Sequence, residues 1–146
     1  MLLALKFIAM LTAAIFAGAA LYVNLVEHPA RMTLDNRAAA LEWAPAYARG
    51  TWMQAPLAVA SFLSGLGAWW SGGGVGWALA AMLIGAVVPF TFLAIMPTNQ
   101  LLLARGRDLA SPETRALLER WARLHAVRTV LSLASTMLYL ALALER

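Results

Sequence analysis

The sequence of 146 residues contains no cysteine and few charged residues. Without cysteine there is no disulfide, no thiolate metal site and no thiol redox chemistry, which excludes the small membrane oxidoreductases that work through a cysteine pair. Asp, Glu, Lys and Arg make up only 12% of the chain, roughly half of what a soluble domain carries. Hydrophobic residues make up 62%, more than a water-soluble core of this size can hide. We therefore expect lipid to be the solvent for much of the chain.

The net charge of +4 is compatible with nucleic acid as a partner, but the basic residues sit beside apolar stretches. Membrane topology and anionic lipid headgroups explain this placement more simply. Membrane lipid is therefore an expected partner, and nucleic acid is not.

Four apolar stretches come near the length of about 20 residues that a spanning helix needs. They predict an all-α integral membrane protein, a single domain over residues 1–146 that folds as an up-and-down bundle of four transmembrane helices. The expected spans are residues 2–26, 56–70, 75–96 and 124–144. The first also has features of a secretory signal, because FAGAA supplies small residues, but its apolar run continues past that point.

The connections between the spans carry patterns of their own. WWSGGGVGW predicts a tight hairpin whose tryptophans, Trp69, Trp70 and Trp77, form an interfacial belt. LDNRAAALEWAPAYARG in loop one predicts a short helix on the membrane interface, with Trp43 and Tyr47 at the level of the lipid headgroups. In loop three, TNQLLLARG predicts a short helix ended by Gly106.

Serine and proline residues predict where helices begin and end. Ser111 followed by Pro112 predicts the start of a long helix that runs to about Leu144. Pro29 and Pro97 are expected to end or break the first and third spans.

The distribution of Lys and Arg predicts the orientation of the bundle. Loops one and three, with the start of the last helix, carry most of the arginines, whereas the termini carry only Lys6 and Arg146. Positive charge favours the cytoplasmic side. We therefore expect loops one and three in the cytoplasm and both termini outside.

Polar residues within the spans follow helical stripes. The stripe on the last helix consists of Trp121, His125, Arg128, Ser132, Ser135 and Tyr139. The first helix has a stripe of alanines that ends in Asn24 and Glu27, and the second has Gln54, Ser61 and Ser64. Small residues allow close contact in lipid and polar ones avoid the acyl chains, so these stripes are expected to face one another.

The ends of three helices are predicted to bring ionisable groups to one membrane face. Glu27 and His28 end the first helix, Asn99 lies at the end of the third, and His125 and Arg128 open the fourth. Ionisable groups inside a membrane mark functional sites. The simpler interpretation is an ion pair between Glu27 and Arg128, with the histidines as hydrogen-bonding groups and Asn99 as a turn cap.

Three stretches resemble the anthrone-oxygenase-like family of small four-helix membrane proteins: GAALYVNLVEHPARM, PFTFLAIMPTNQLLL and LERWARLHAVRTVLSLAS. The similarity extends over almost the whole chain. It implies the fold and, for some fungal members, an activity, the O₂-dependent oxidation of polycyclic anthrones to anthraquinones. Many bacterial relatives have no assigned activity, and we expect a multi-pass protein of a bacterial inner membrane. The matching positions are Asn24, Glu27, His28, Pro97, Asn99, Trp121, His125 and Arg128.

This resemblance favours an oxidoreductase that acts with O₂ on a flat polycyclic, phenolic or quinone-type apolar substrate. Removal of an acidic C–H proton leaves an electron-rich anion that can pass an electron to O₂, so neither flavin nor metal is strictly needed. We expect His125 to be the catalytic base, with His28 as the second candidate and Glu27 orienting a histidine. The expected substrate-binding residues are Asn24, Asn99, Trp121 and Arg128. Asn99 and Arg128 would stabilise the oxyanion, and Trp121 would stack on the rings.

Two alternatives remain open. The first is a metal-dependent oxidoreductase, which would use Glu27, His28 and His125 as metal ligands or would hold a haem between the two histidines. Against the metal site, the adjacent side chains of Glu27 and His28 diverge by about 100° on a helix. The second is a non-catalytic protein, either a membrane subunit or a scaffold that binds lipid or a cofactor. Such a protein would pack solidly around the ionisable groups. A cavity lined by both histidines would instead favour an enzyme. A homo-oligomer is compatible with each of these functions.

Overall fold

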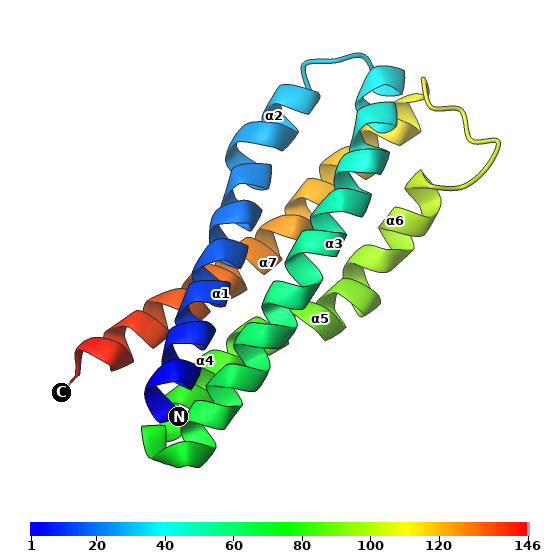
Figure 1. Cartoon of the computed structure of the whole chain (residues 1–146). Coiled ribbons are helices and arrows are strands. Elements are labelled where there is room, and N and C mark those ends of the chain that lie inside the picture. Colours follow the sequence, from blue (N-terminus) through cyan, green and yellow to red (C-terminus); the bar gives the residue numbers. More distant parts are fainter. Residues whose placement is uncertain (146) are drawn as a thin grey trace.

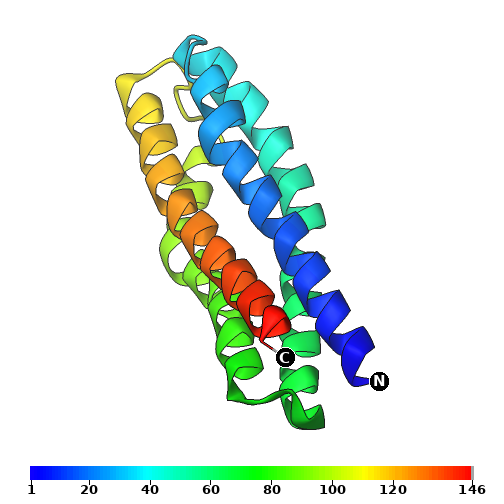
Figure 2. The same ribbon diagram turned by 90° about the vertical axis from the view of Figure 1, so that its left-hand side faces the viewer.

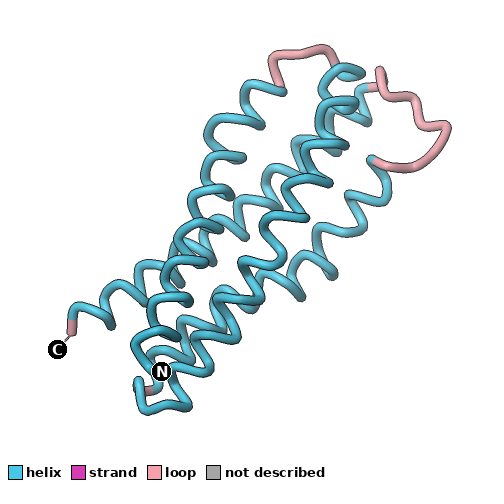
Figure 3. Tube along the Cα trace, viewed as in Figure 1, coloured by secondary structure: helices cyan, strands magenta, loops and turns pink. Residues whose placement is uncertain are grey.

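The computed structural model describes residues 1–145, and Arg146, which entered the charge comparison above, lies outside the described residues. The described chain is helical and has no β-strand. Its helices form four long rods that run alternately up and down (Figures 1 and 3). Both ends of the described chain lie at the same end of the bundle as the glycine hairpin, and the two longer loops lie at the opposite end (Figure 1). The predicted all-α, up-and-down fold is confirmed.

Each rod is built from one or more helices that follow one another along the chain. The first consists of α1 (Leu2–Tyr22), the π-helical η1 (Val23–Glu27) and α2 (His28–Arg31). The second is α3 (Asn36–Ala68), followed by η2 (Trp69–Gly73). The third consists of α4 (Val75–Gly85), α5 (Val87–Phe90), the π-helical η3 (Thr91–Ile95) and α6 (Met96–Leu102). The fourth is α7 (Pro112–Leu144).

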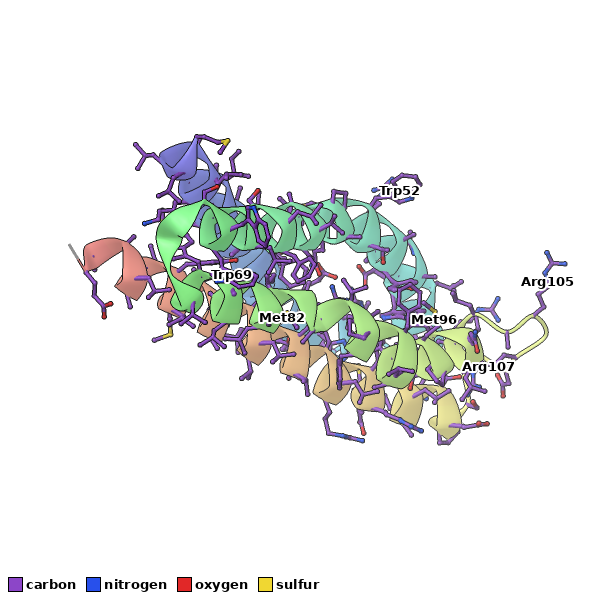
Figure 4. The ribbon with its side chains drawn as sticks, turned by 90° about the horizontal axis from the view of Figure 1, so that it is seen from below. Trp52, Trp69, Met82, Met96, Arg105 and Arg107 are labelled. Atoms are coloured by element: carbon purple, nitrogen blue, oxygen red, sulfur yellow. The ribbon has the colours of Figure 1, made fainter. Side chains whose placement is uncertain are left out.

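Among the described residues, three rods are long and apolar enough to cross a membrane: Leu2–Arg31, Val75–Leu102 and Pro112–Leu144. The second rod does not reach that composition, because the first half of α3 carries Arg37, Glu42 and Arg49 and its apolar second half is short. Large apolar side chains cover the outside of the bundle, as on a surface that contacts lipid; Trp52, for example, points away from α3 (Figure 4).

The boundaries predicted from proline are wrong. Pro29 lies in the first turn of α2, and the first rod continues to Arg31. Pro97 lies in the first turn of α6, and the third rod continues to Leu102 without a separate helix in loop three. A π-helical stretch, η1 or η3, ends two residues before each of these two prolines. Its wider turns leave room for the proline ring, and neighbouring groups in a helical bundle can satisfy the freed carbonyl.

The short interfacial helix expected in loop one is also wrong, because that segment is the first half of α3. This helix is continuous through Pro45 and Pro56 over 33 residues, a length of roughly 50 Å at 1.5 Å per residue. The consequence for the site is large, because this segment contacts the end of the first rod through Glu42 and Arg31 and contacts α7 through Trp43 and Trp121.

Two predictions from helix caps and glycine are confirmed. The side chain of Ser111 accepts a hydrogen bond from the backbone N–H of Thr114, and α7 runs to Leu144. In the hairpin, Gly72 and Gly74 have φ of 90° and 91°, a backbone region that favours glycine. Trp69 and Trp70 are exposed at this end, but Trp77 is buried against the Tyr139 ring at 5.2 Å and does not belong to an interfacial belt.

Small side chains pack the rods tightly in the hairpin half of the bundle. A Cβ atom at Gly65 would lie 2.0 Å from the hydroxyl oxygen of Tyr139. The Ser61 hydroxyl donates to the carbonyl of Ala9 at 2.9 Å, and the Ser135 hydroxyl donates to that of Ala80 at 2.7 Å. The predicted stripes therefore face one another, and hydroxyl groups join neighbouring helices through their backbones.

Candidate active site

A cavity of about 420 Å³ lies in the loop half of the bundle, between the first rod, α3 and α7. Cavities of roughly 300–1,000 Å³ are typical of small-molecule sites. Side chains from all three rods line it, including Glu27 of η1, Trp43 and Tyr47 of α3, and Trp121, His125 and Arg128 of α7. The first rod and α7 lie next to each other along this half (Figure 2).

Asn24, on the wide π turn of η1, joins the first rod to α7. Its Nδ2 donates to the carbonyl of Ala122 at 3.1 Å, and its Oδ1 accepts from the Thr129 hydroxyl at 2.6 Å. The same oxygen lies 2.9 Å from Nδ1 of His125. Because Nδ2 faces a carbonyl, the amide orientation is fixed, and Oδ1 must accept from an Nδ1–H group.

This contact determines which nitrogen of His125 is free. In the neutral imidazole with a proton on Nδ1, the lone pair lies on Nε2. His125 is 3% exposed and lines the cavity. Its Nε2 is therefore the ring nitrogen available to a bound molecule, in the way that an orienting partner fixes the tautomer of a catalytic histidine.

His28 has a different environment. Its Nδ1 lies 3.3 Å from Nη1 of Arg31, which can only donate, so Nδ1 acts as the acceptor. His28 is buried and does not line the cavity. Of the two candidate bases, only His125 faces the space where a substrate could bind.

Arg31 is the charged residue that sequence reasoning missed. Its side chain is 1% exposed and donates to the carboxylates of both Glu27 and Glu42. The predicted ion pair between Glu27 and Arg128 is wrong, and Glu27 does not contact a histidine through a hydrogen bond in the described structure. The reason is the continuous first rod, which brings residue 31 within reach of residue 27 one helical turn away.

Arg128 is half-buried and carries a positive charge without a carboxylate partner among the described residues. Its Nη2 donates to Oε1 of Gln54 at 2.8 Å, and its buried Nε has no partner. The guanidinium carbon lies 5.4 Å from the centre of the Phe16 ring. A buried charge is usually paired, so this arrangement favours an anionic ligand in the cavity.

Aromatic rings form one wall of the cavity. Trp121 packs against both imidazoles, with ring centres 5.6 Å from His28 and 4.9 Å from His125, so the two histidines meet at one level as expected. Trp43 meets Trp121 edge-on at 5.8 Å and stacks on Tyr47 at 5.1 Å, with only 5° between the planes. Trp43 and Tyr47 are four residues apart, so on a continuous helix they lie on the same face, and this spacing could have predicted their stacking.

Asn99 does not reach this cavity. It is 1% exposed in α6, and neither its Oδ1 nor its Nδ2 has a hydrogen-bond partner in the described chain. The neighbouring Thr98 hydroxyl is also buried without a partner. Asn99 lines neither of the cavities that Arg128 lines, although both residues were expected to stabilise an oxyanion.

The three side chains expected as alternative metal ligands, Glu27, His28 and His125, do not form one cluster in the described chain. No three His, Asp or Glu side chains within residues 1–145 lie close enough together to hold a metal ion. Glu27 is bound to Arg31, and only His125 of the two histidines lines the cavity.

Comparison with known proteins shows which family the chain resembles. Residues 43–138 match the sequence profile of a family described as anthrone oxygenase. The chain is 31% identical over 121 residues to the anthrone oxygenase ptaC of Pestalotiopsis fici, a match that covers 70% of this chain and 82% of that protein. It is 40% identical over 70 residues to the anthrone oxygenase tpcL of Aspergillus fumigatus, covering 46% of this chain and 44% of the relative.

An anthrone oxygenase of Claviceps purpurea is 34% identical over 61 residues, covering 36% of this chain and 35% of its own length. The chain thus spans less than half of two of these curated relatives. No solved structure matches it. The profile match includes Trp43, Trp121, His125 and Arg128, and the first rod lies before it.

Proposed function

Because this chain belongs to the anthrone oxygenase family, we propose that it is a membrane-embedded oxygenase that oxidises a flat polycyclic ketone of the anthrone class with O₂. The observation that supports this proposal most strongly is that two groups line the same cavity: the Nε2 atom of His125, which is free to accept a proton, and Arg128, whose charge has no carboxylate partner in the described chain. A base and a fixed positive charge are what the removal of an acidic C–H proton requires.

Binding would use the aromatic wall. A flat apolar ring system gains favourable contact area against Trp43, Tyr47 and Trp121, which present both faces and edges. Exclusion of water from this space strengthens the electrostatic interactions inside it.

Proton removal would begin the reaction. His125 Nε2 accepts a proton from the methylene carbon of the substrate, and the Asn24 Oδ1 contact stabilises the imidazolium that forms by holding its Nδ1–H. The negative charge moves onto the ketone oxygen, where the Arg128 guanidinium stabilises it. We give His28 no proton-transfer role, since its Nδ1 faces Arg31.

The balanced reaction needs only the substrate and O₂. The methylene group loses two hydrogens, one atom of O₂ becomes the new carbonyl oxygen, and the other leaves as water. The electron-rich anion itself reduces O₂, so we propose that no resident metal, haem or flavin takes part; elemental analysis and the visible spectrum of the purified protein test that part.

The non-catalytic alternative predicted a solid bundle at the histidine cluster. A 420 Å³ cavity beside His125 argues against a purely structural role for this region.

We also propose that the loop half faces the cytoplasm of a bacterial cell. Arg105 and Arg107 lie in the loop at this end, far from Trp69 at the hairpin end (Figure 4). Accessibility of single cysteines placed in the α6–α7 loop and in the hairpin tests the orientation. Labelling of the loop cysteine from outside intact cells would contradict it.

The test of function uses the full chain in lipid nanodiscs with anthrone and O₂. We expect anthraquinone with one O₂ consumed per product, and a loss of about 10²–10⁴-fold in His125→Ala. Ser132→Ala is the matched control, because Ser132 is buried on the same face of α7 but does not line the cavity. Equal rates in wild type, His125→Ala and protein-free nanodiscs would contradict the proposal.

A further inference from the structure

A second, smaller cavity of about 120 Å³ adjoins the first. It lies between α3 and the third rod, and Arg128 of α7 also lines it. In this region α5 and α6 run alongside α3 (Figure 1). Tyr47, Thr51 and Arg128 line both cavities, so the two spaces meet at these side chains. It is too small for a polycyclic substrate.

The walls of the small cavity offer a guest almost no hydrogen bonds. Most of its lining is apolar and comes from Phe16, Ala55, Ala58, Val87, Val88 and Met96. Its two threonine hydroxyls donate to their own helices, Thr51 to the carbonyl of Tyr47 at 2.9 Å and Thr91 to that of Val87 at 2.7 Å. Apolar cavities of comparable size, about 150 Å³, stay free of water and bind small apolar guests such as xenon.

Besides the threonines, two polar residues interrupt this apolar lining, Tyr47 and Arg128, and only Arg128 carries a charge. Its guanidinium stands at the junction of the two cavities and has no carboxylate partner among residues 1–145. A positive charge there has no stabilising role toward a neutral apolar guest, but it would stabilise that guest once it accepts an electron.

We propose that this small cavity binds O₂ and holds it beside Arg128, next to a substrate anion in the larger cavity. The proposal rests on the proposed function. The substrate anion passes one electron to O₂, giving a substrate radical and superoxide. Their combination forms a C–O bond and a peroxide anion, which takes back the first proton from His125. Loss of the second methylene proton with cleavage of the O–O bond then gives the carbonyl and hydroxide, and this hydroxide and the released proton form water.

The outer side of the cavity suits this guest. Val88 and Phe92 line it and are 37% and 64% exposed on the apolar surface of the bundle. O₂ is apolar and moves favourably from water into hydrocarbon, so it would reach the cavity from the lipid without passing through the substrate cavity.

The first test fills the mouth of the small cavity in the full-length protein. Val88→Phe adds volume at a partly exposed position that does not line the large cavity. We expect the KM for O₂ to rise by about tenfold, equivalent to ~1.4 kcal/mol, with the KM for anthrone unchanged. Val130→Phe is the matched control, because Val130 is 65% exposed on α7 and lines none of the cavities, and its KM for O₂ should equal that of the wild type.

A second readout does not depend on oxygenase activity. Crystals of the wild-type protein pressurised with xenon should show a xenon atom in the small cavity, and those of Val88→Phe should not. A wild-type KM for O₂ in folded, active Val88→Phe, or xenon absent from this cavity, would overturn the O₂ site while leaving the proposed function intact. Xenon in the cavity of a protein that does not oxidise anthrone would overturn the proposed function instead.

Discussion

The two halves of the bundle are built on opposite principles. In the hairpin half, alanine, glycine and serine bring the helices together, and Gly65 leaves less than a methyl group of space beside Tyr139. In the loop half, tryptophan and charged side chains hold the rods apart around a cavity. The same four rods thus provide a closely packed support at one end and an open, polar site at the other.

The hydrogen bonds of the two halves differ in the same way. Hydroxyl groups of the hairpin half, such as those of Ser61 and Ser135, donate to backbone carbonyls of neighbouring helices and are fully used. In the loop half, Arg128 and Trp121 keep buried nitrogen atoms without partners. Unsatisfied buried polar groups are costly and uncommon, and those found in the described residues all lie in the loop half, which distinguishes it from the supporting hairpin half.

After His125→Ala, the largest effect should come from removing the charge of Arg128. Arg128→Met keeps much of the side-chain volume but removes the group that we propose stabilises the substrate anion. We expect kcat to fall by about 10²–10³-fold, as for loss of an oxyanion donor. Steady-state rates of anthraquinone formation measure it. A rate within a factor of about two of wild type, where such a donor is worth far more, would remove Arg128 from catalysis.

Loss of the Asn24 side chain, which joins the first rod to α7, should have an intermediate effect on turnover. Asn24→Leu removes the acceptor that holds the Nδ1–H of His125. We expect turnover to fall by roughly 10–100-fold, since a hydrogen bond to a charged group contributes about 1.5–3 kcal/mol. Asn24→Asp restores an acceptor and should recover part of the rate. Equal rates for the leucine and aspartate variants would show that the contact is only structural.

A pair of glycine substitutions should distinguish the two halves by stability. Gly65→Ala forces the helices apart and should lower the free energy of unfolding by about 1–3 kcal/mol. Gly50→Ala, in the loop half, meets no atom within 4 Å and should raise it by about 0.5–1 kcal/mol, because alanine is the better helix former. Thermal unfolding of both variants in the same detergent is the measurement. Similar losses in both would contradict the difference in packing.

The smallest effect is expected at the half-exposed end of the Arg31 network. The Glu42 side chain is 45% exposed, so Glu42→Gln should cost only about 0.2–1 kcal/mol of stability. Turnover should stay near wild type, since Glu42 does not line the cavity. A large loss of activity in a folded variant would mean that Arg31 positions His28 for a role that we do not assign to it.

Local signals in the sequence predicted those parts of the fold that depend on local chemistry. The cap at Ser111, the glycines of the hairpin and the polar stripe from Trp121 to Tyr139 all behave as expected. Proline misled the prediction, because a proline near a π-helical stretch inside a bundle does not end its helix.

Those errors also hid part of the site. With loop one expected on the membrane surface, Trp43 and Tyr47 were treated as interfacial anchors rather than as a wall of the cavity. If the first helix ends at His28, Arg31 lies in loop one, and its charge then bears only on the predicted orientation in the membrane. Long-range contacts decided the remaining points, since no pattern within α6 shows that Asn99 lies away from Arg128.

The most direct test of the central claim is proton exchange without O₂. Anthrone deuterated at its methylene group is incubated anaerobically with the protein in nanodiscs, and loss of deuterium is followed by NMR. We expect wild type and Val88→Phe to catalyse the exchange above the spontaneous rate, and His125→Ala to show only the spontaneous rate. Exchange at the wild-type rate in His125→Ala would contradict the assignment of His125 as the base of this cavity.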